Sequence, residues 1–160
     1  MIFRRPRPAD ADRCFEIERT AYAGDEAATR AKILTRIETW PEGFVALEKQ
    51  DEILGFINSG CAHEVDMADE AFKELIGHDP DAPNVVILSV VVDPAHQGEG
   101  HARALMDEFV RRMRGLGKAT IHLMCRDHHV PLYERLGYRY VRPSDSDHGG
   151  LVWHEMRMDL

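Results

Sequence analysis

The segment from residue 85 to residue 113 constrains the fold more than any other part of this sequence. Residues 85–92 are a run of valine, isoleucine, leucine and one serine, which is typical of a strand buried on both faces of a sheet. Residues 102–113 follow a helical repeat, with apolar side chains on one stripe at Ala102, Leu105, Met106, Phe109 and Met113. A further apolar strand is expected at residues 120–124. Strand, helix and strand in this order predict a parallel pair joined by a crossover.

The remaining segments predict antiparallel strands and further helices. Helices are expected at 10–21, 26–40 and 131–136, with a weaker helical pattern at 67–76. Strands are expected at 2–5, 44–48, 53–57, 138–141 and 152–158, with a hairpin turn at 49–52, an extension at 61–64 and a loop at 77–84. The predicted fold is α/β, with a mixed, mostly antiparallel sheet of about seven strands flanked by about four helices.

Length and composition indicate a single folded domain over residues 1–160. Apolar residues make up 44% of the chain and charged residues 30%, which fits a globular protein and disfavours disorder. No run of about 18 apolar residues is present, so no membrane partner is expected. The first residues lack the apolar stretch of a secretory signal.

The cysteines and the net charge limit the compartment and the partners. Cys14, Cys61 and Cys125 lie far apart and are odd in number, which predicts neither a disulfide framework nor a zinc site. We therefore expect a reducing, cytoplasmic location. The net charge of −8 disfavours nucleic acid as a partner. It favours a cationic substrate, although surface solvation alone explains such a charge.

The loop that follows the central strand is a candidate anion site. Gly98 and Gly100 allow a tight turn and a close approach of a ligand to the backbone. The helix that follows directs its free N–H groups and positive dipole end at this loop, which suits a pyrophosphate. The spacing is neither the GxGxxG of dinucleotide folds nor a P-loop.

Two motifs resemble those of the GNAT superfamily of N-acetyltransferases. Residues 92–102 read Val-x-Pro-x-x-Gln-Gly-x-Gly-x-Ala and contain the superfamily's acetyl-CoA signature, here at Gln97, Gly100 and Ala102. Residues 132–138 read Leu-Tyr-Glu-Arg-Leu-Gly-Tyr and are similar to a second superfamily segment. The order of the expected elements agrees with this superfamily along nearly the whole chain.

A closer resemblance is to the arylalkylamine (serotonin-type) N-acetyltransferases and their microbial relatives. It is carried by residues 14–19, 123–127, 130–135 and 153–156. It is patchy over residues 23–84, where that family forms its acceptor pocket. The resemblance implies acetyl-CoA as cosubstrate, no metal, and one N-acetyltransferase domain. It implies coenzyme contacts at Ser89, Val90, Val91, Val92, Gln97, Gly98, Glu99, Gly100, His101, Ala102, Cys125, Asp127, Leu132 and Tyr133.

Acyl transfer to an amine needs a proton donor for the leaving thiolate. The resemblance gives this role to Tyr133. A phenol with a pKa near 10 can protonate a thiolate whose acid has a pKa of about 8.5. The alternative is a core tyrosine with a satisfied hydroxyl. Cys125 could be proposed as an acetyl-accepting nucleophile, but no local base is evident and a small residue at a strand end is the favoured interpretation.

The reaction also needs a base, because an alkylamine is only about 0.1% neutral at pH 7. Vertebrate-type relatives use two histidines on the central strand, and Val86 and Leu88 occupy those positions here. Insect-type relatives use the glutamate of an Asp-Glu pair, which Asp25 and Glu26 match. Glu26 is therefore the candidate base, acting through water. Capping of the next helix is its alternative role, and the weaker candidates for the base are His63, Asp66 and Glu70.

The resulting prediction is direct transfer of an acetyl group from acetyl-CoA to a primary amine, an arylalkylamine or a polyamine. The alternatives are acetylation of a protein or peptide, and a non-catalytic acyl-CoA-binding module. The adjacent pair His128 and His129 is not expected to bind a metal, because neighbouring residues seldom face one ion. Superfamily members often dimerise, so the resemblance also allows a homodimer.

Overall fold

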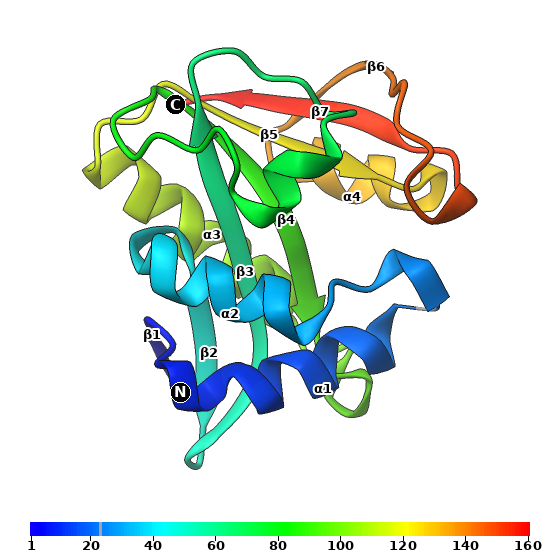
Figure 1. Cartoon of the computed structure of the whole chain (residues 1–160). Helices are drawn as coiled ribbons and strands as arrows, with labels where there is room; N and C mark the ends of the chain where they lie inside the picture. The colour runs from blue at the N-terminus through cyan, green and yellow to red at the C-terminus, as the bar shows by residue number, and fades with distance from the viewer. Residues whose placement is uncertain (23) are drawn as a thin grey trace.

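A computed structural model describes residues 1–22 and 24–160, without the side chain of Asp25. The predicted central strand is β4 (Asn84–Val92), in the middle of a seven-stranded sheet (Figure 1). The strand order is β1 (Ile2–Arg4), β2 (Val45–Lys49), β3 (Glu52–Ala62), β4, β5 (Thr120–Cys125), β7 (His154–Asp159) and β6 (Arg139–Pro143). The β4–β5 pair is parallel and the other described pairs are antiparallel, which confirms the predicted mixed sheet.

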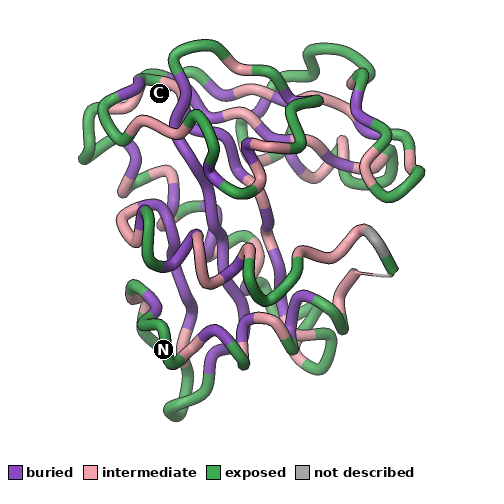
Figure 2. The backbone as a smooth tube through the Cα atoms, viewed as in Figure 1, coloured by how far each residue is buried: buried purple, intermediate pink, exposed green. Residues whose placement is uncertain are grey.

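Helices cover both faces of the sheet. One face carries α1 (Ala11–Ala21) and α2 (Arg30–Thr39), and the other carries α3 (His101–Gly115) and α4 (Val130–Arg135). Neighbouring side chains of a strand point to opposite faces. In β2, Ala46 accordingly packs toward α1 and α2, whereas Val45 and Leu47 pack toward α3. Figure 2 shows the buried residues concentrated along these central strands.

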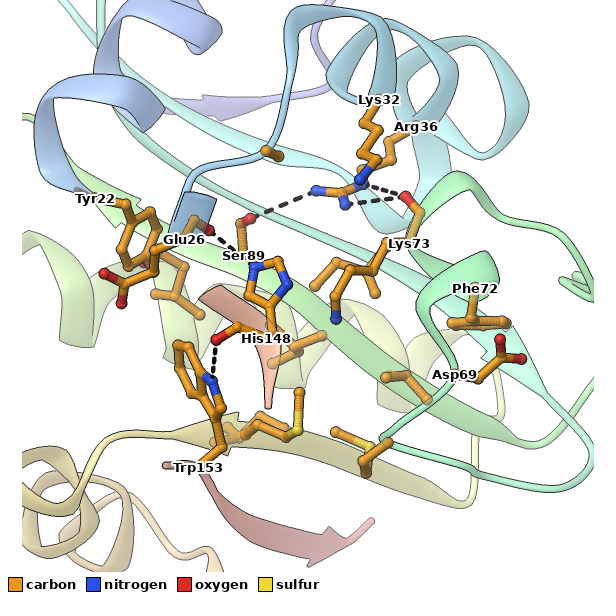
Figure 3. Close-up of a pocket in the computed structure, with 18 of the residues that line it drawn as sticks. Tyr22, Glu26, Lys32, Arg36, Asp69, Phe72, Lys73, Ser89, His148 and Trp153 are labelled. Carbon is orange, nitrogen blue, oxygen red and sulfur yellow. Dashed lines mark hydrogen bonds between the residues drawn. The ribbon is translucent and has the colours of Figure 1, made fainter. Parts of the chain in front are cut away.

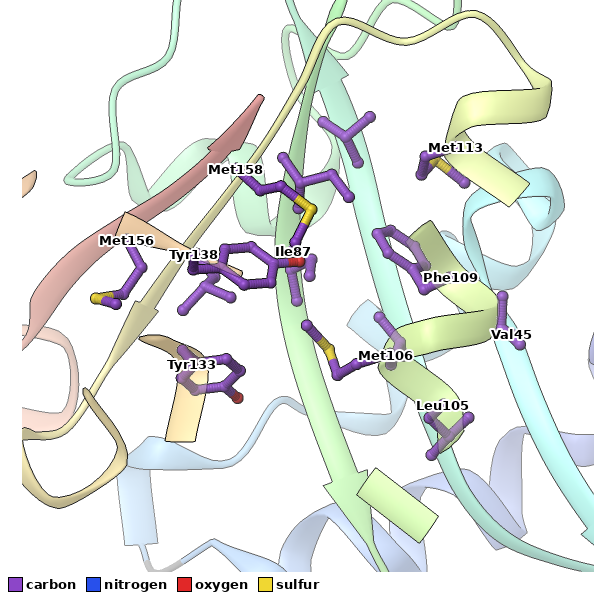
Figure 4. Close-up of a cluster of buried hydrophobic side chains, with 14 of the residues drawn as sticks. Val45, Ile87, Leu105, Met106, Phe109, Met113, Tyr133, Tyr138, Met156 and Met158 are labelled. Atoms are coloured by element: carbon purple, nitrogen blue, oxygen red, sulfur yellow. The ribbon is translucent and has the colours of Figure 1, made fainter. Parts of the chain in front are cut away.

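The predicted stripe of α3 forms the centre of the core on its face. Leu105, Met106, Phe109 and Met113 are at most 2% exposed. They join a cluster of buried side chains that includes Ile87 of β4 and Tyr133 of α4 (Figure 4). Burial of apolar area of this kind is the main driving force for folding. The crossover helix is thereby fixed directly behind the central strand.

A β-bulge interrupts β4 near its middle. Asn58 of β3 is opposite Ser89, but Ser59 is opposite Ile87, so Leu88 is an extra residue. A bulge changes which face the following side chains occupy. Ile87 faces α3 before the bulge, and Val92 does so after it, five residues later. From Ser89 onward the side chains of β4 therefore occupy the opposite faces from those that regular alternation would give them.

The two strands of the parallel pair separate immediately before this bulge. β4 pairs with β3 as far as Val92, but it pairs with β5 only from Asn84 to Val86. The second half of β4 consequently has one edge without a strand neighbour. A wedge-shaped opening between β4 and β5 follows from this divergence.

Two helix predictions need correction. α2 begins at Arg30 rather than at residue 26, because the Thr29 hydroxyl accepts a hydrogen bond from the Lys32 N–H at 3.2 Å and caps the helix there. Glu26 lies instead in a short 3-10 turn, Gly24–Glu26, so its alternative role as a cap of α2 is wrong.

The weak helical pattern at 67–76 yields a single 3-10 turn, η4 (Glu70–Glu74). Leu75 ends it in the left-handed conformation, with φ of 61°. η4 packs on β3. The strand expected at 53–57 and the start of its expected extension at 61–64 form this one continuous strand. At Gly60 an added Cβ would lie 2.7 Å from the Leu75 side chain and 2.9 Å from Phe72. The absence of a side chain at residue 60 therefore allows this close packing.

In the described part of the chain, no helix has both the length and the apolar character needed to cross a membrane. Cys14, Cys61 and Cys125 are buried and free.

The close contact between β3 and β4 gives a stability prediction at Gly55. An added Cβ would lie 2.6 Å from the backbone oxygen of Val91, which cannot move without displacing the sheet. We expect Gly55→Ala to lower the free energy of unfolding by about 1–3 kcal/mol in urea denaturation.

Gly115→Ala is the matched control for this substitution. Gly115 ends α3 with open space around the position of an added Cβ. Its replacement should be neutral or should stabilise the protein by up to about 1 kcal/mol. An equal effect of both substitutions would contradict the proposed clash.

Candidate active site

A pocket opens where β4 leaves β5. Its walls come from α1, the turn at Gly24–Glu26, α2, η4, both strands, α4 and the segment 148–153 (Figure 3). Four of the residues assigned to catalysis or coenzyme binding line it, namely Glu26, Ser89, Val90 and Tyr133, and so does the weaker base candidate Asp66. Residues more than one hundred positions apart in the sequence are thus brought to one cavity.

Tyr133 enters the pocket from α4. Its ring is 9% exposed and packs edge-to-face on Tyr138, with ring centroids 5.9 Å apart. Burial raises the pKa of Tyr133 above its usual value because the phenolate would lose its hydration. The hydroxyl therefore stays protonated at neutral pH and is available as a donor.

The unpaired edge of β4 supplies backbone groups to the pocket. The carbonyl oxygen of Val90 accepts a hydrogen bond from the Tyr22 hydroxyl at 2.9 Å, so α1 is tied to this edge. Ser89 is buried beside it, with its hydroxyl oxygen 3.5 Å from an Arg36 nitrogen. Val91 points away into the core under α1 and α2, so only its backbone can serve this side.

Glu26 is held at the pocket by residues near the C-terminus. The His148 ring nitrogen Nε2 lies 3.1 Å from the Glu26 carbonyl oxygen. The Trp153 indole in turn donates to the His148 carbonyl at 2.8 Å. Both residues line the pocket (Figure 3). Sequence reasoning missed His148, because its Gly- and Asp-rich segment carries no periodic pattern.

Sequence reasoning also missed two buried charges in the pocket wall. Glu18 is 1% exposed and Arg36 is 2% exposed. The Glu18 carboxylate accepts the Ala28 N–H at 3.2 Å, and burial raises its pKa. Their signal was available in the sequence: each sits on the apolar stripe of its helix, Glu18 beside Ile17 and Arg36 between Ile33 and Ile37.

Arg36 connects three elements around the bulge. It donates to the Lys73 carbonyl at 3.1 and 3.0 Å and to the Asn58 side chain at 3.2 Å. Burial lowers the pKa of Arg36 to about 10, although the nearby Glu18 carboxylate opposes that shift. The guanidinium thus fixes η4 against the central strands.

The loop before α3 presents a bare backbone. Gly98 and Gly100 have φ of 80° and 83°, and nothing lies within 4 Å of an added Cβ at either position. Gly100 caps α3 without a side-chain hydrogen bond. The first N–H groups of this 15-residue helix have no acceptor within the helix, an arrangement that suits a pyrophosphate.

Side chains around this loop are paired with one another. The Gln97 amide donates to the Val92 carbonyl at 3.4 Å. The Glu99 carboxylate lies 2.9 Å from buried His101, and this contact lowers the pKa of Glu99. Ala102 begins the packed stripe of α3. These residues lie beyond the pocket, at the carboxyl end of β4.

The remaining residues predicted to contact the coenzyme lie on β5, on the turn after it and on α4. Burial raises the pKa of the Cys125 thiol to about 11, so it is protonated at neutral pH. Asp127 is exposed and pairs with His154, and Leu132 is half-buried in α4.

The weaker candidates for the base divide into two groups. Asp66 lines the pocket and Glu70 lies 3.4 Å from His148, whereas His63 pairs with Asp79 at 2.7 Å outside the lining residues. Val86 and Leu88 do line the pocket. Among the described residues no group of three or more His, Cys, Asp or Glu side chains could hold a metal ion.

Structures of known proteins share this architecture. The loading GNATL domain of CurA from Lyngbya majuscula matches with a TM-score of 0.86 at 18% identity, over 99% of this chain and 96% of that one. The GphF GNAT-like decarboxylase in complex with isobutyryl-CoA matches with a TM-score of 0.85 at 20% identity, over 99% of both chains. YncA from Salmonella typhimurium, a putative acetyltransferase solved with acetyl-CoA, matches at 0.72 with 21% identity, over 100% and 94%. At these identities the likeness establishes the fold.

Sequence comparison identifies relatives as well. Serotonin N-acetyltransferase 2, chloroplastic, from Oryza sativa subsp. japonica is 40% identical over 55 residues, which are 34% of this chain and 28% of that protein. The match therefore spans less than a third of that relative's length. The model of the acetyltransferase (GNAT) family matches residues 11–138. The chain belongs to the acetyltransferase (GNAT) family, which confirms the family expected from the two motifs.

Proposed function

We propose that this protein transfers the acetyl group of acetyl-CoA directly to the primary amine of a small molecule. The observation that carries the proposal is the pocket at the divergence of β4 and β5, where Glu26, Ser89 and Tyr133 meet. It offers an acid, a carboxylate and free backbone donors within one cavity. These are the groups that amine acylation requires.

Different parts of the coenzyme are assigned to the edge of β4 and to the loop that follows this strand. The glycine loop and the start of α3 hold the pyrophosphate of the coenzyme. The unpaired edge of β4 holds the pantetheine arm, and N–H groups near the bulge stabilise the oxyanion that develops on the thioester carbonyl. Ser89, Val90 and Val92 supply these backbone groups.

Proton transfer is assigned to two side chains. Glu26, through a water molecule, accepts a proton from the substrate ammonium, and the amine then attacks the thioester carbon. The bond from that carbon to sulfur breaks, and Tyr133 donates its proton to the departing thiolate. The nitrogen loses its second proton as the amide forms, and this proton returns to Tyr133 through water. Glu26 releases its proton to solvent, so one proton is released per turnover.

The acceptor is proposed to be a small arylalkylamine or a polyamine. Apolar side chains of Phe72, Met124 and Trp153 line the pocket and suit an aryl group. A peptide acceptor is disfavoured because η4 and Met67 cover this side. The three buried, free cysteines support a cytoplasmic location, and a homodimer remains part of the proposal.

The first test is release of free thiol from acetyl-CoA with a panel of tryptamine, phenethylamine, spermidine and a lysine peptide. The proposal expects turnover with at least one small amine. Coenzyme A binding without thiol release across a wide panel would support the non-catalytic module instead.

Tyr133→Phe tests the proton donor. We expect kcat to fall by about 10²- to 10⁴-fold, because the leaving thiolate loses its acid. The affinity for coenzyme A, measured by calorimetry, should change little because the ring remains. Tyr138→Phe is the matched control, since it removes a buried hydroxyl that has no partner among the described residues. Equal activity of the two variants would exclude the assigned role.

Glu26→Gln tests the base. The amide cannot accept the proton, so kcat should drop by about 10²-fold or more. Glu38→Gln, at an exposed position near the end of α2, is the control. A change in KM alone would reassign Glu26 to substrate binding.

A further inference from the structure

One wall of the active-site pocket is cationic. Lys32 and Arg36 reach it from α2, and Lys73 reaches it from η4 (Figure 3). We call these three residues the cationic wall. Arg36 is buried, and the Lys73 side chain is only 14% exposed. Long charged side chains are seldom this deeply buried without a partner.

Arg36 and Lys73 differ in how their charge is compensated. Arg36 donates hydrogen bonds to Lys73, Asn58 and Ser89 and has the buried Glu18 carboxylate nearby. The Lys73 ammonium has no such arrangement. Among the side chains that the structure describes, its nearest carboxylate oxygen belongs to Glu70, at 4.0 Å, beyond hydrogen-bond distance. Arg36 is therefore part of the frame, and Lys73 is the cation that is open to a ligand.

In the described part of the chain, no other acidic side chain forms an ion pair with Lys73. Glu70 is 54% exposed and also lies 3.4 Å from His148. Asp66 and Asp69 are exposed at the rim, and each accepts a hydrogen bond from a backbone N–H two residues further on. Burial lowers the pKa of Lys73, and repulsion by Arg36 and Lys32 adds to this, while Glu70 opposes it. A bound anion would relieve the repulsion and form charge-assisted hydrogen bonds.

The pocket therefore has two poles. Glu26 and Tyr133 form the end at which the amine reacts, and the cationic wall forms the other. Apolar side chains of Phe72, Met124 and Trp153 also line it. A ligand that matches all three regions has an amine, an apolar middle and an anionic group.

We propose that the acetyl acceptor carries a carboxylate in addition to its amine, and that Lys73, assisted by Lys32, binds this carboxylate. This inference rests on the proposed function and narrows it to amino carboxylates with an apolar middle. A polyamine is disfavoured because its second ammonium would face the cationic wall. Lys73 lies on η4, whereas the thioester is assigned to the edge of β4 near Ser89, so we place the carboxylate on the acceptor and not on the acyl group.

The test compares acceptors that differ in the carboxylate alone: 4-(aminomethyl)benzoate and benzylamine, with acetyl-CoA. A hydrogen bond to a charged group contributes about 1.5–3 kcal/mol, so kcat/KM should be higher for the carboxylate by about 10- to 150-fold. Lys73→Met should reduce this ratio by a similar factor, and Lys73→Arg should restore part of it. Lys49→Met, at the exposed end of β2, is the control.

Three results would overturn the inference. The first is a kcat/KM for benzylamine or spermidine that equals or exceeds that for the carboxylate. The second is an unchanged ratio in Lys73→Met, provided that thermal unfolding shows a folded variant. The third is a higher rate with succinyl-CoA and benzylamine than with acetyl-CoA and the carboxylate, which would assign the wall to the acyl group.

A binding measurement separates this inference from the proposed function. If no amine releases thiol, the proposed function fails. Calorimetry of 4-(aminomethyl)benzoate with the coenzyme A-loaded protein still decides the inference. A Kd that rises about tenfold or more in Lys73→Met, and less in Lys32→Met, supports it. Absence of binding to the unmodified protein would exclude it.

Discussion

The parting of β4 from β5 after Val86 is the constraint on which the rest of this structure depends. Buried backbone N–H and C=O groups need partners, and a strand that loses its neighbour must find them elsewhere. β3 continues to pair with β4 as far as Val92, so the strand stays in place while its other edge opens. Tyr22 satisfies the Val90 carbonyl on that edge. The remaining groups can be used by a ligand, and α4 places Tyr133 at the same opening.

Buried charge gives the pocket its shape. Isolated ionised groups are unfavourable in an apolar core, and a paired set is weak evidence for added stability. Arg36 nevertheless joins the 3-10 turn η4, β3 and β4 through its hydrogen bonds, and Glu18 receives the N–H of the segment leading to α2. These contacts set the positions of elements that apolar packing alone would leave free to slide. The main effect of these buried polar groups is therefore to fix the relative positions of the elements, and their contribution to stability is secondary.

The predictable parts of the fold are those governed by local pattern. The apolar run at 85–92 is typical of a buried strand, and the stripe from Leu105 to Met113 follows the repeat of a helix. Both elements were correctly predicted. The predicted start of α2 was wrong because residues 26–28 are good helix formers by composition, whereas the cap at Thr29 determines where the helix begins. Glu18 and Arg36 interrupt the apolar stripes of their helices, which marks them as buried charges, but their contacts across the fold could not be predicted from that pattern. His148 lies in a segment without a periodic pattern and was missed. The roles assigned to Tyr133, Glu26 and the glycine loop come from motif resemblance and stay predictions.

The lack of a side chain at Gly60 has a consequence for how substitutions can change the size of the pocket. Phe72 and Leu75 rest directly on it, and Phe72 lines the cavity. A methyl group at residue 60 would push Phe72 and Leu75 away from β3 and leave Glu26 and Tyr133 in place. The size of the acceptor site can accordingly change through a residue of β3 that lies beneath the pocket wall, while the groups proposed to transfer protons stay the same.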